Sequence, residues 1–257
     1  MKTVLVTGAA QGLGLTAAIL LSQREYRVIL VDIQSVEAQV LRIRERGGEA
    51  HGISGDVSSE EFVQDLAKNV GNEYGAIDGL VNNAGISLIV PAEQTSAAQW
   101  QRVMAINLFA PFLLCRYLGA QMLKRGSGSI VNVASIAGLA GVSHRSAYNA
   151  SKHGLVGLTQ TLAGEWGGRG VRVNAVCPGW IKTEMDAADQ GAGAYSDGDI
   201  IDRVPLARFA RPEDVAEAIA FLLDGNRSGF INGVSLPVDG GWLADASWNS
   251  LRLSTRG

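Results

Sequence analysis

The sequence contains few of the residues that build disulfide-bonded or metal-bound domains. Its 257 residues include two cysteines and three histidines. Cys115 and Cys177 lie in separate apolar stretches and lack the spacing of metal ligands. This excludes a disulfide scaffold and fits a reducing compartment, so we expect a cytoplasmic protein. No three histidines or acidic residues converge in sequence as a zinc site requires, and we predict no bound metal.

Charge of one sign and long apolar runs are also scarce. Charged residues make up 18% of the chain and leave a net charge of -3, so no basic field is available to attract a nucleic acid. No uninterrupted apolar run reaches the ~18 residues that cross a bilayer. The strand-like start of the chain is broken by Gly8 and Gln11, which is not typical of a signal peptide. We therefore expect neither a nucleic-acid partner nor a membrane partner.

Apolar residues and glycine, in contrast, are abundant. The hydrophobic fraction of 47% argues against disorder, and the 32 glycines exceed the usual share of ~7%. Short apolar runs predict strands over residues 2–7, 27–31, 49–55, 77–81, 129–134, 171–177 and 234–238. Longer amphipathic stretches predict helices over residues 12–23, 36–46, 58–73, 97–125, 146–166 and 212–223. Ser58 and Glu61 form a capping-box pattern, and Pro111 predicts a bend in the longest helix.

The alternation of strands and helices predicts an α/β fold. We expect a single Rossmann-type domain, a doubly wound parallel sheet of about seven strands with helices on both faces. No linker, repeat or charge block divides residues 1–257. Residues 178–210 show no clean period, and we interpret 183–205 as an irregular insertion that forms a mobile substrate loop, with an ordinary surface loop as the alternative. Residues 242–257 form a C-terminal tail.

A glycine-rich turn joins the first predicted strand to the first predicted helix. Gly8 allows a tight turn, Gly12 lets backbone approach a pyrophosphate, and Gly14 permits close packing of helix on sheet. The helix N-terminus then offers free N–H groups to the phosphates. No lysine follows the last glycine, which excludes a P-loop. The pattern indicates a dinucleotide site, with glycines used only for packing as the alternative.

Asp32 ends the second predicted strand, where an acid can bind a ribose 2′-hydroxyl. It would repel a 2′-phosphate, and neither Ile33 nor Gln11 carries a positive charge to compensate. The sequence therefore favours NAD over NADP. Asp32 could also cap the following helix, and the two roles are compatible.

Tyr148 and Lys152 lie four residues apart on a predicted helix, so their side chains share a face. A free tyrosine has a pKa of about 10 and is a poor base at neutral pH. A nearby ammonium group, together with the positive charge of an oxidised nicotinamide, favours the phenolate and lowers that pKa. Ser135 follows a strand end, where ligands gather in open α/β sheets, and its hydroxyl can hold the reacting oxygen.

These motifs occur in one order along the chain. They are T-G-x-x-x-G-x-G at 7–14, Asp56-Val57, Asn82-Asn83-Ala84-Gly85, Asn107, Ser135, Tyr148-x-x-x-Lys152, Pro178-Gly179 with Thr183, and Asp239-Gly240-Gly241. Together they make the chain resemble the short-chain dehydrogenase/reductase family over residues 2–241. The resemblance implies that the catalytic residues are Asn107, Ser135, Tyr148 and Lys152. It implies a cofactor site made of Gly8, Gln11, Gly12, Leu13, Gly14, Asp32, Ile33, Asp56, Val57, Asn83, Ala84, Gly85, Tyr148, Lys152, Pro178, Gly179, Ile181 and Thr183.

The resemblance also implies the reaction and the assembly. Tyr148 would take the proton of a secondary alcohol while hydride passes to the nicotinamide, Lys152 would also hold the nicotinamide ribose, and Asn107 would support a water that relays the proton. Helices 97–125 and 146–166 are the dimer faces of most relatives, and we predict a homotetramer. Trp242 and Trp248 of the tail would pack on a neighbouring subunit or on the surface of their own chain.

The substrate pocket is less defined by sequence. We expect it to contain Ser87, Leu88, Ala137, Val142, His144, Trp180, Glu184 and Met185. Arg145 could attract an anionic or polyhydroxy substrate, although a solvated loop position is favoured. We expect an NAD-dependent dehydrogenase of a sugar, polyol or hydroxy acid. The alternatives are an NADPH-dependent 3-oxoacyl-carrier ketoreductase and a dinucleotide-binding scaffold without turnover.

Overall fold

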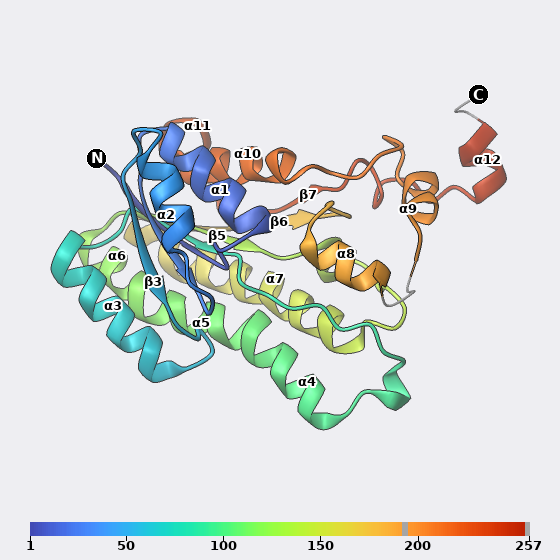
Figure 1. Ribbon diagram of the computed structural model, residues 1–257, viewed down its shortest axis with the longest axis horizontal. Coiled ribbons are helices and arrows are strands. Elements are labelled where there is room, and N and C mark those ends of the chain that lie inside the picture. Colours follow the sequence, from blue (N-terminus) through green and yellow to red (C-terminus); the bar gives the residue numbers. More distant parts are fainter. Residues whose placement is uncertain (192–194, 255–257) are drawn as a thin grey trace.

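Seven parallel strands form one sheet at the centre of the protein. The computed structural model describes residues 1–191 and 195–254; the parts of the expected substrate loop and tail at 192–194 and 255–257 lie outside the described residues. The strand order is β3-β2-β1-β4-β5-β6-β7 (Figure 1). The strands are β1 (Thr3–Thr7), β2 (Arg27–Asp32), β3 (Ala50–Ser54), β4 (Gly79–Asn82), β5 (Gly128–Val133), β6 (Val171–Pro178) and β7 (Ser235–Val238). The predicted Rossmann-type sheet is confirmed.

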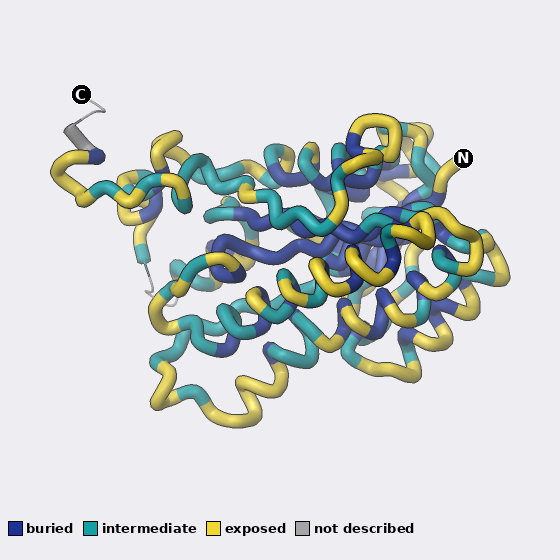
Figure 2. Tube along the Cα trace, turned by 180° about the vertical axis from the view of Figure 1, so that it is seen from behind, coloured by how far each residue is buried: buried dark blue, intermediate teal, exposed yellow. Residues whose placement is uncertain are grey.

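Helices cover both faces of this sheet because successive strand residues point to opposite sides. In β1, Val4 and Val6 belong to one hydrophobic core and Leu5 belongs to the other. The first core is closed by α1 (Gly12–Gln23), α2 (Glu37–Arg44) and α10 (Pro212–Leu223), and the second by α3 (Glu60–Tyr74) and the helices that follow β4 and β5. The strands between the edge strands β3 and β7 are the most deeply buried part of the chain (Figure 2).

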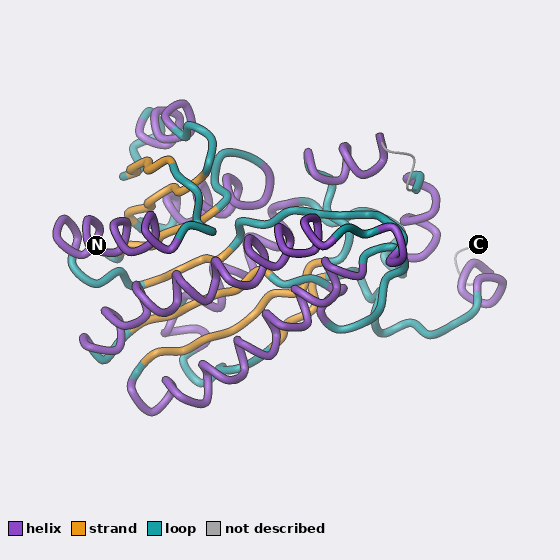
Figure 3. Tube along the Cα trace, turned by 90° about the horizontal axis from the view of Figure 1, so that it is seen from below, coloured by secondary structure: helices purple, strands orange, loops and turns teal. Residues whose placement is uncertain are grey.

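The long helix after β4 covers the second face together with α7 (Ser146–Trp166); in Figure 3 the helices over the sheet run along the strands. Its regular parts are α4 (Ala97–Met104), α5 (Ala110–Leu114) and α6 (Ala120–Arg125). Two π-helical turns, Ala105–Phe109 and Cys115–Gly119, separate them, and Pro111 is the second residue after the first turn. By length and composition alone this stretch could span a bilayer, but half of its apolar window is buried in the fold, as in a core helix.

Several local expectations were wrong. The segment 183–205 is not irregular where it is described: it contains α8 (Glu184–Gly191) and α9 (Asp197–Arg203). Ser59, and not Ser58, caps α3 by accepting from Phe62 N, because the Ser58 hydroxyl donates to the Asp56 carboxylate. After β7 the chain ends in α12 (Asn249–Ser254), which extends away from the sheet (Figure 1); the short helix α11 (Gly225–Ser228) precedes β7.

The strand order reverses between β1 and β4. The chain moves outward from β1 to β3, then returns to β4 on the other side of β1. At such a switch point the helices after neighbouring strands diverge to opposite faces, and a crevice opens at the carboxyl ends of the strands. The glycine turn, the loop after β4 and Ser135 after β5 all lie at this edge.

Candidate active site

A cavity of about 460 Å³ occupies this crevice. Its wall includes nearly all the residues that the sequence predicts for a cofactor: Gly8, Gln11, Gly12, Leu13, Asp32, Ile33, Asp56, Val57, Asn83, Ala84, Gly85, Tyr148, Lys152, Pro178, Gly179, Ile181 and Thr183. Gly14 and Asn107 lie behind the wall. The cavity therefore brings the predicted cofactor residues and the predicted catalytic residues to one place.

The glycine turn has the backbone that a pyrophosphate cradle needs. Gly8 and Gly12 adopt φ angles of +65° and +56°, which side chains disfavour. A Cβ at Gly14 would lie 2.1 Å from the Gly8 carbonyl oxygen, so only glycine fits there. The first N–H groups of α1 have no partner within the helix and face the turn. These features fit the phosphates of a dinucleotide.

Asn83 and Thr7 lock this turn to the loop after β4. The Asn83 amide donates to the carbonyls of Thr7 and Gly8 at 2.9 and 3.1 Å. The Thr7 hydroxyl accepts from the backbone N–H groups of Asn83 and Ala84 at 3.0 and 3.1 Å. The two sides of the switch point are thus joined by four hydrogen bonds, which hold the cradle rigid.

Asp32 lies at the end of β2 and lines the cavity. Its carboxylate accepts from Ala10 N and from Gln34 N, both at 3.0 Å. It does not cap α2, whose N-cap residue is Val36. Arg102 of α4 also lines the cavity, and the sequence reasoning missed it. A hydrogen bond from Ser58 lowers the pKa of Asp56, and the charge of Arg102 lowers it further.

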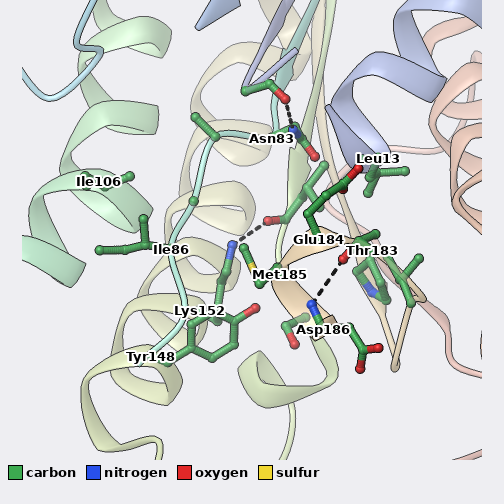
Figure 4. Close-up of a pocket in the computed structure, with 18 of the residues that line it drawn as sticks. Leu13, Asn83, Ile86, Ile106, Tyr148, Lys152, Thr183, Glu184, Met185 and Asp186 are labelled. Carbon is green, nitrogen blue, oxygen red and sulfur yellow. Dashed lines mark hydrogen bonds between the residues drawn. The ribbon is translucent and has the colours of Figure 1, made fainter. Parts of the chain in front are cut away.

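Tyr148 and Lys152 project from α7 toward the interior of the cavity (Figure 4). Lys152 Nζ lies 5.6 Å from the centre of the Tyr148 ring and donates to the Val133 carbonyl at 2.8 Å. The lysine is 4% exposed. Burial lowers the pKa of Lys152 to about 8. The ammonium group is therefore held beside the phenol by a strand carbonyl.

The pKa of Tyr148 differs from the sequence expectation. Burial raises the pKa of Tyr148 above its usual value. Hydrogen bonding to Ser135 and the charge of Arg145 lower this pKa, while the charge of Asp189 raises it. The described chain therefore keeps the phenol protonated at neutral pH. Ser135 is itself oriented, because its hydroxyl accepts from Ala137 N at 3.1 Å.

Asn107 reaches the site from a π-helical turn, a feature often found at functional sites. Its side chain is fully buried. Nδ2 donates to the Ile86 carbonyl and to Ser151 Oγ, and Oδ1 accepts from Ile86 N. Asn107 thus fixes the loop after β4, on which Gly85 and Ile86 line the cavity.

The expected substrate residues divide into two groups. Ala137, Val142, Trp180, Glu184 and Met185 line the cavity. Ser87, Leu88 and His144 are not part of its wall, and the exposed His144 adopts a φ of +61°. Glu184 lies at the glycine turn, where its carboxylate would be 3.2 Å from a Cβ at Gly12, so it faces the phosphate end of the cavity.

Comparison with known proteins agrees with this geometry. A family model described as enoyl-(acyl carrier protein) reductase matches residues 8–243. The chain belongs to the short-chain dehydrogenase/reductase family. D-threitol dehydrogenase of Mycolicibacterium smegmatis is 40% identical over 246 residues, which is 94% of this chain and 92% of the relative. The 3-oxoacyl-[acyl-carrier-protein] reductase of Synechocystis is 37% identical over 245 residues, covering 94% of this chain and 97% of the relative.

Solved structures of the family superpose on nearly the whole chain. One from Beutenbergia cavernae, named provisionally as an NAD(P)-dependent gluconate 5-dehydrogenase, contains NADP at low occupancy. It has a TM-score of 0.90 and 37% identity and covers 95% of this chain and 97% of its own. This chain is thus an oxidoreductase of the short-chain dehydrogenase/reductase family, whose structural neighbours bind nicotinamide dinucleotides.

In this short-chain dehydrogenase/reductase, the sequence did not reveal several residues at the substrate end of the cavity. Arg145 is not a solvated loop residue: its side chain is 12% exposed and pairs with Asp189 of α8 at 3.1 Å. Tyr195 also lines the cavity and donates to Asp186. Trp180 packs between the rings of Tyr195 and Trp242, so Trp242 contacts its own chain. Arg145 lies three residues before Tyr148, so the sequence places it close to the site. No pattern in the sequence identifies Asp189 as its partner.

Proposed function

We propose that the protein is an NAD-dependent dehydrogenase of secondary alcohols, with polyols, sugars and hydroxy acids as the favoured substrate classes. The observation that carries this proposal is the placement of Tyr148 and Lys152 in the same cavity as the glycine turn and Asp32. One cavity thus offers a phosphate cradle, a ribose-binding acid and a phenol that can exchange a proton.

The residues of the chain manage the substrate oxygen and its proton. The Ser135 hydroxyl holds the substrate oxygen, and Tyr148 removes the proton from that oxygen as the alcohol is oxidised. The bound nicotinamide supplies the hydride acceptor, so a secondary alcohol and NAD⁺ give a ketone, NADH and a proton. Lys152, anchored on Val133, keeps a positive charge beside the phenol.

Because the pKa of Tyr148 is raised in the chain alone, the bound cofactor must lower this pKa before Tyr148 can act as a base. Burial opposes the phenolate in the chain alone. A cationic nicotinamide beside the phenol would favour the phenolate, because an opposite charge within a few ångströms stabilises the charged form. In the reduction direction the same protonated phenol is ready to donate. The site therefore suits reversible interconversion of alcohol and ketone.

The choice of NAD rests on Asp32. Its carboxylate lies at the end of β2 beside Ile33, with no cation next to it on that strand. Arg102 lines the same cavity from α4 and is the residue that could offset a 2′-phosphate. We propose NAD because the position of Asp32 at the end of the strand is the one that contacts the ribose hydroxyls in this fold.

An alcohol panel assayed with NAD and with NADP tests the proposal. The panel contains xylitol, threitol, xylonate and cyclohexanol, and reduced cofactor is followed by absorbance. We expect NAD-dependent oxidation of at least one hydroxylated compound. Preference for NADPH with reduction of a 3-oxoacyl thioester would instead support the ketoreductase alternative, which the similarity to the Synechocystis reductase favours.

The homotetramer and the cytoplasmic location remain predictions. Phe109 and Phe112 of the long helix are 44% and 40% exposed and stack on each other, which is consistent with a covered face in an assembly. Leu113, Leu155 and Leu162 instead fill the core of their own chain. A monomer in light scattering at micromolar concentration would refute the tetramer.

A further inference from the structure

Ser87, Arg145 and Asp189 form a polar cluster beside the catalytic tyrosine, and the reaction above does not use it. Arg145 donates to Ser87 Oγ at 3.0 Å and to Asp189 Oδ2 at 3.1 Å. Ser87 Oγ donates to the same Oδ2 at 3.0 Å. The Arg145 guanidinium carbon lies 5.8 Å from the centre of the Tyr148 ring. The cluster joins the loop after β4, the start of α7 and the helix α8 at the end of the cavity that holds the tyrosine.

The charge of Arg145 is already neutralised within this cluster. The side chains of Arg145 and Asp189 are only 12% and 16% exposed, so solvent screens their attraction weakly. Lys152 is held by the Val133 carbonyl. Of the other acids of α8 that line the cavity, Glu184 faces the glycine turn, and Asp186 accepts from Tyr195 and pairs with Lys182. Among the described residues at this end of the cavity, the charge of Arg145 is therefore cancelled by Asp189, and Lys152 is the cation without a carboxylate partner.

The cluster nevertheless keeps free hydrogen-bonding capacity of both kinds. An arginine has five N–H donors, and Arg145 uses two of them on Ser87 and Asp189, so three N–H groups have no acceptor among the described residues. Asp189 Oδ1 likewise has no donor in the part of the chain that the structure describes. A hydroxyl group both donates and accepts, whereas a carboxylate or phosphate only accepts. The free groups are thus matched to hydroxyls.

We propose, on the basis of the dehydrogenase function above, that Arg145 and Asp189, which line the cavity and are joined by Ser87, bind the hydroxyls next to the reacting carbon of an uncharged polyol. Asp189 both accepts from such a hydroxyl and cancels the charge of Arg145. Carboxylate and phosphate substrates are disfavoured because this cancellation leaves Arg145 without a net charge to attract them. The substrate class is therefore narrowed from polyols, sugars and hydroxy acids to uncharged polyhydroxy compounds.

The experiment compares xylitol with xylonate, which has the same number of carbons but carries a carboxylate. The value of kcat/KM for each compound is measured with NAD for the wild type and for Asp189→Asn, which keeps the shape and releases the charge of Arg145. We expect the wild type to prefer xylitol. Asp189→Asn should raise the xylonate-to-xylitol ratio by about tenfold or more, since specificity is a difference between two affinities.

Two further variants make the result decisive. Arg145→Gln leaves Asp189 uncompensated, so the same ratio should fall below that of the wild type. Asp65→Asn removes the same charge from an exposed position on α3 and should leave the ratio unchanged. Equal ratios in wild type, Asp189→Asn and Arg145→Gln overturn the inference even if xylitol is oxidised.

Failure of the proposed function gives a different result. A wild-type protein that oxidises no compound of the panel refutes the dehydrogenase. The ratio of the two dissociation constants, measured by calorimetry on the same variants, then decides the inference about the cluster. A ratio that shifts in opposite directions in Asp189→Asn and Arg145→Gln supports it, and an unchanged ratio overturns it.

Discussion

The side-chain amide of Asn107 is hydrogen-bonded on both of its sides to the backbone of Ile86. Nδ2 donates to the Ile86 carbonyl at 3.0 Å, and Oδ1 accepts from Ile86 N at 2.9 Å. The pair ties the π-helical turn of the long helix to the loop that follows β4. Because Gly85 and Ile86 line the cavity, this pair sets the position of one cavity wall relative to α7.

Asn107→Ala should therefore disturb both stability and turnover. It leaves both backbone groups of the half-buried Ile86 without their partner, and each such group costs up to about 1–3 kcal/mol. We expect a lower melting temperature together with a lower kcat, since the cavity wall shifts. Asn72→Ala, at an exposed position of α3, serves as the control. A loss of stability with an unchanged kcat would show that the pair is structural only.

The glycine turn provides a second prediction, because Gly12 and Gly14 should tolerate an added Cβ to different extents. A Cβ at Gly14 would meet the Gly8 carbonyl at 2.1 Å and the Asn83 amide at 2.5 Å, both of which are fixed. A Cβ at Gly12 would lie closest to the Glu184 carboxylate, at 3.2 Å, and in ordinary contact with the Thr183 side chain at 3.8 Å. We expect Gly14→Ala to destabilise the fold by about 1–3 kcal/mol or more and Gly12→Ala to keep the fold but weaken dinucleotide binding.

Thermal unfolding and NADH fluorescence titration check these two variants. Gly141→Ala is the matched control, because a Cβ at this position would have no other atom within 4 Å and the φ of Gly141 is not positive. Equal melting temperatures for Gly14→Ala and Gly141→Ala would contradict the close contact of α1 with the turn.

The sequence was sufficient for the sheet and for the cofactor side of the cavity because those signals are local. A buried parallel strand is a short apolar run, and the turn between Thr7 and Gly14 lies within eight consecutive residues. Tyr148 and Lys152 are likewise neighbours on one helix. Each of these features depends on residues close in sequence, so its position in the fold followed from the order of the elements.

The substrate end could not be predicted because its contacts join distant parts of the chain. Asp189 meets Arg145 across 44 residues and Ser87 across 102 residues. Helix α8 is only eight residues long and has no clear apolar period, so it was interpreted as a loop. The prediction that Ser58 caps α3 failed for a different reason. The Ser58 hydroxyl is hydrogen-bonded to Asp56, and Ser59 caps the helix instead.

Tyr148→Phe separates an enzyme from a binding scaffold. The substitution removes the only phenol oxygen beside Lys152 among the described residues and keeps the ring. We expect kcat to fall by about 10²–10⁴, the usual contribution of a positioned acid or base, while the dissociation constant for NADH stays within about twofold. Turnover equal to that of the wild type would exclude Tyr148 as the proton acceptor.

Asp32→Asn tests the basis of the cofactor preference. Removing the charge ends the repulsion of a 2′-phosphate, while the amide oxygen can still accept from Ala10 N. We expect the ratio of kcat/KM with NADP to kcat/KM with NAD to rise by about tenfold or more, and adding Ile33→Arg at the exposed neighbour should raise it again. An unchanged ratio would show that the charge of Asp32 does not set the cofactor preference.

The buried ammonium of Lys152 predicts a pH-dependent difference in stability. Burial lowers its pKa from 10.5 to about 8 in the folded protein. Below pH 8 both the folded and the unfolded chain carry this proton, and the folded state bears the full cost of the buried charge. Between about pH 8 and 10.5 the unfolded chain binds more protons than the folded one, so the contribution of this lysine to the free energy of unfolding rises with pH.

Lys152→Met removes this group while keeping a side chain of similar length. The free energy of unfolding of the wild type minus that of Lys152→Met should increase from pH 7 to pH 10.5, by at most about 3 kcal/mol. Urea unfolding at pH 7, 8.5 and 10 measures the difference, and Lys68→Met, at an exposed position of α3, corrects for the removal of a lysine in general. A difference that stays constant across this range would mean that the ammonium is not buried beside Val133 in solution, and the stated anchoring of Lys152 would be wrong.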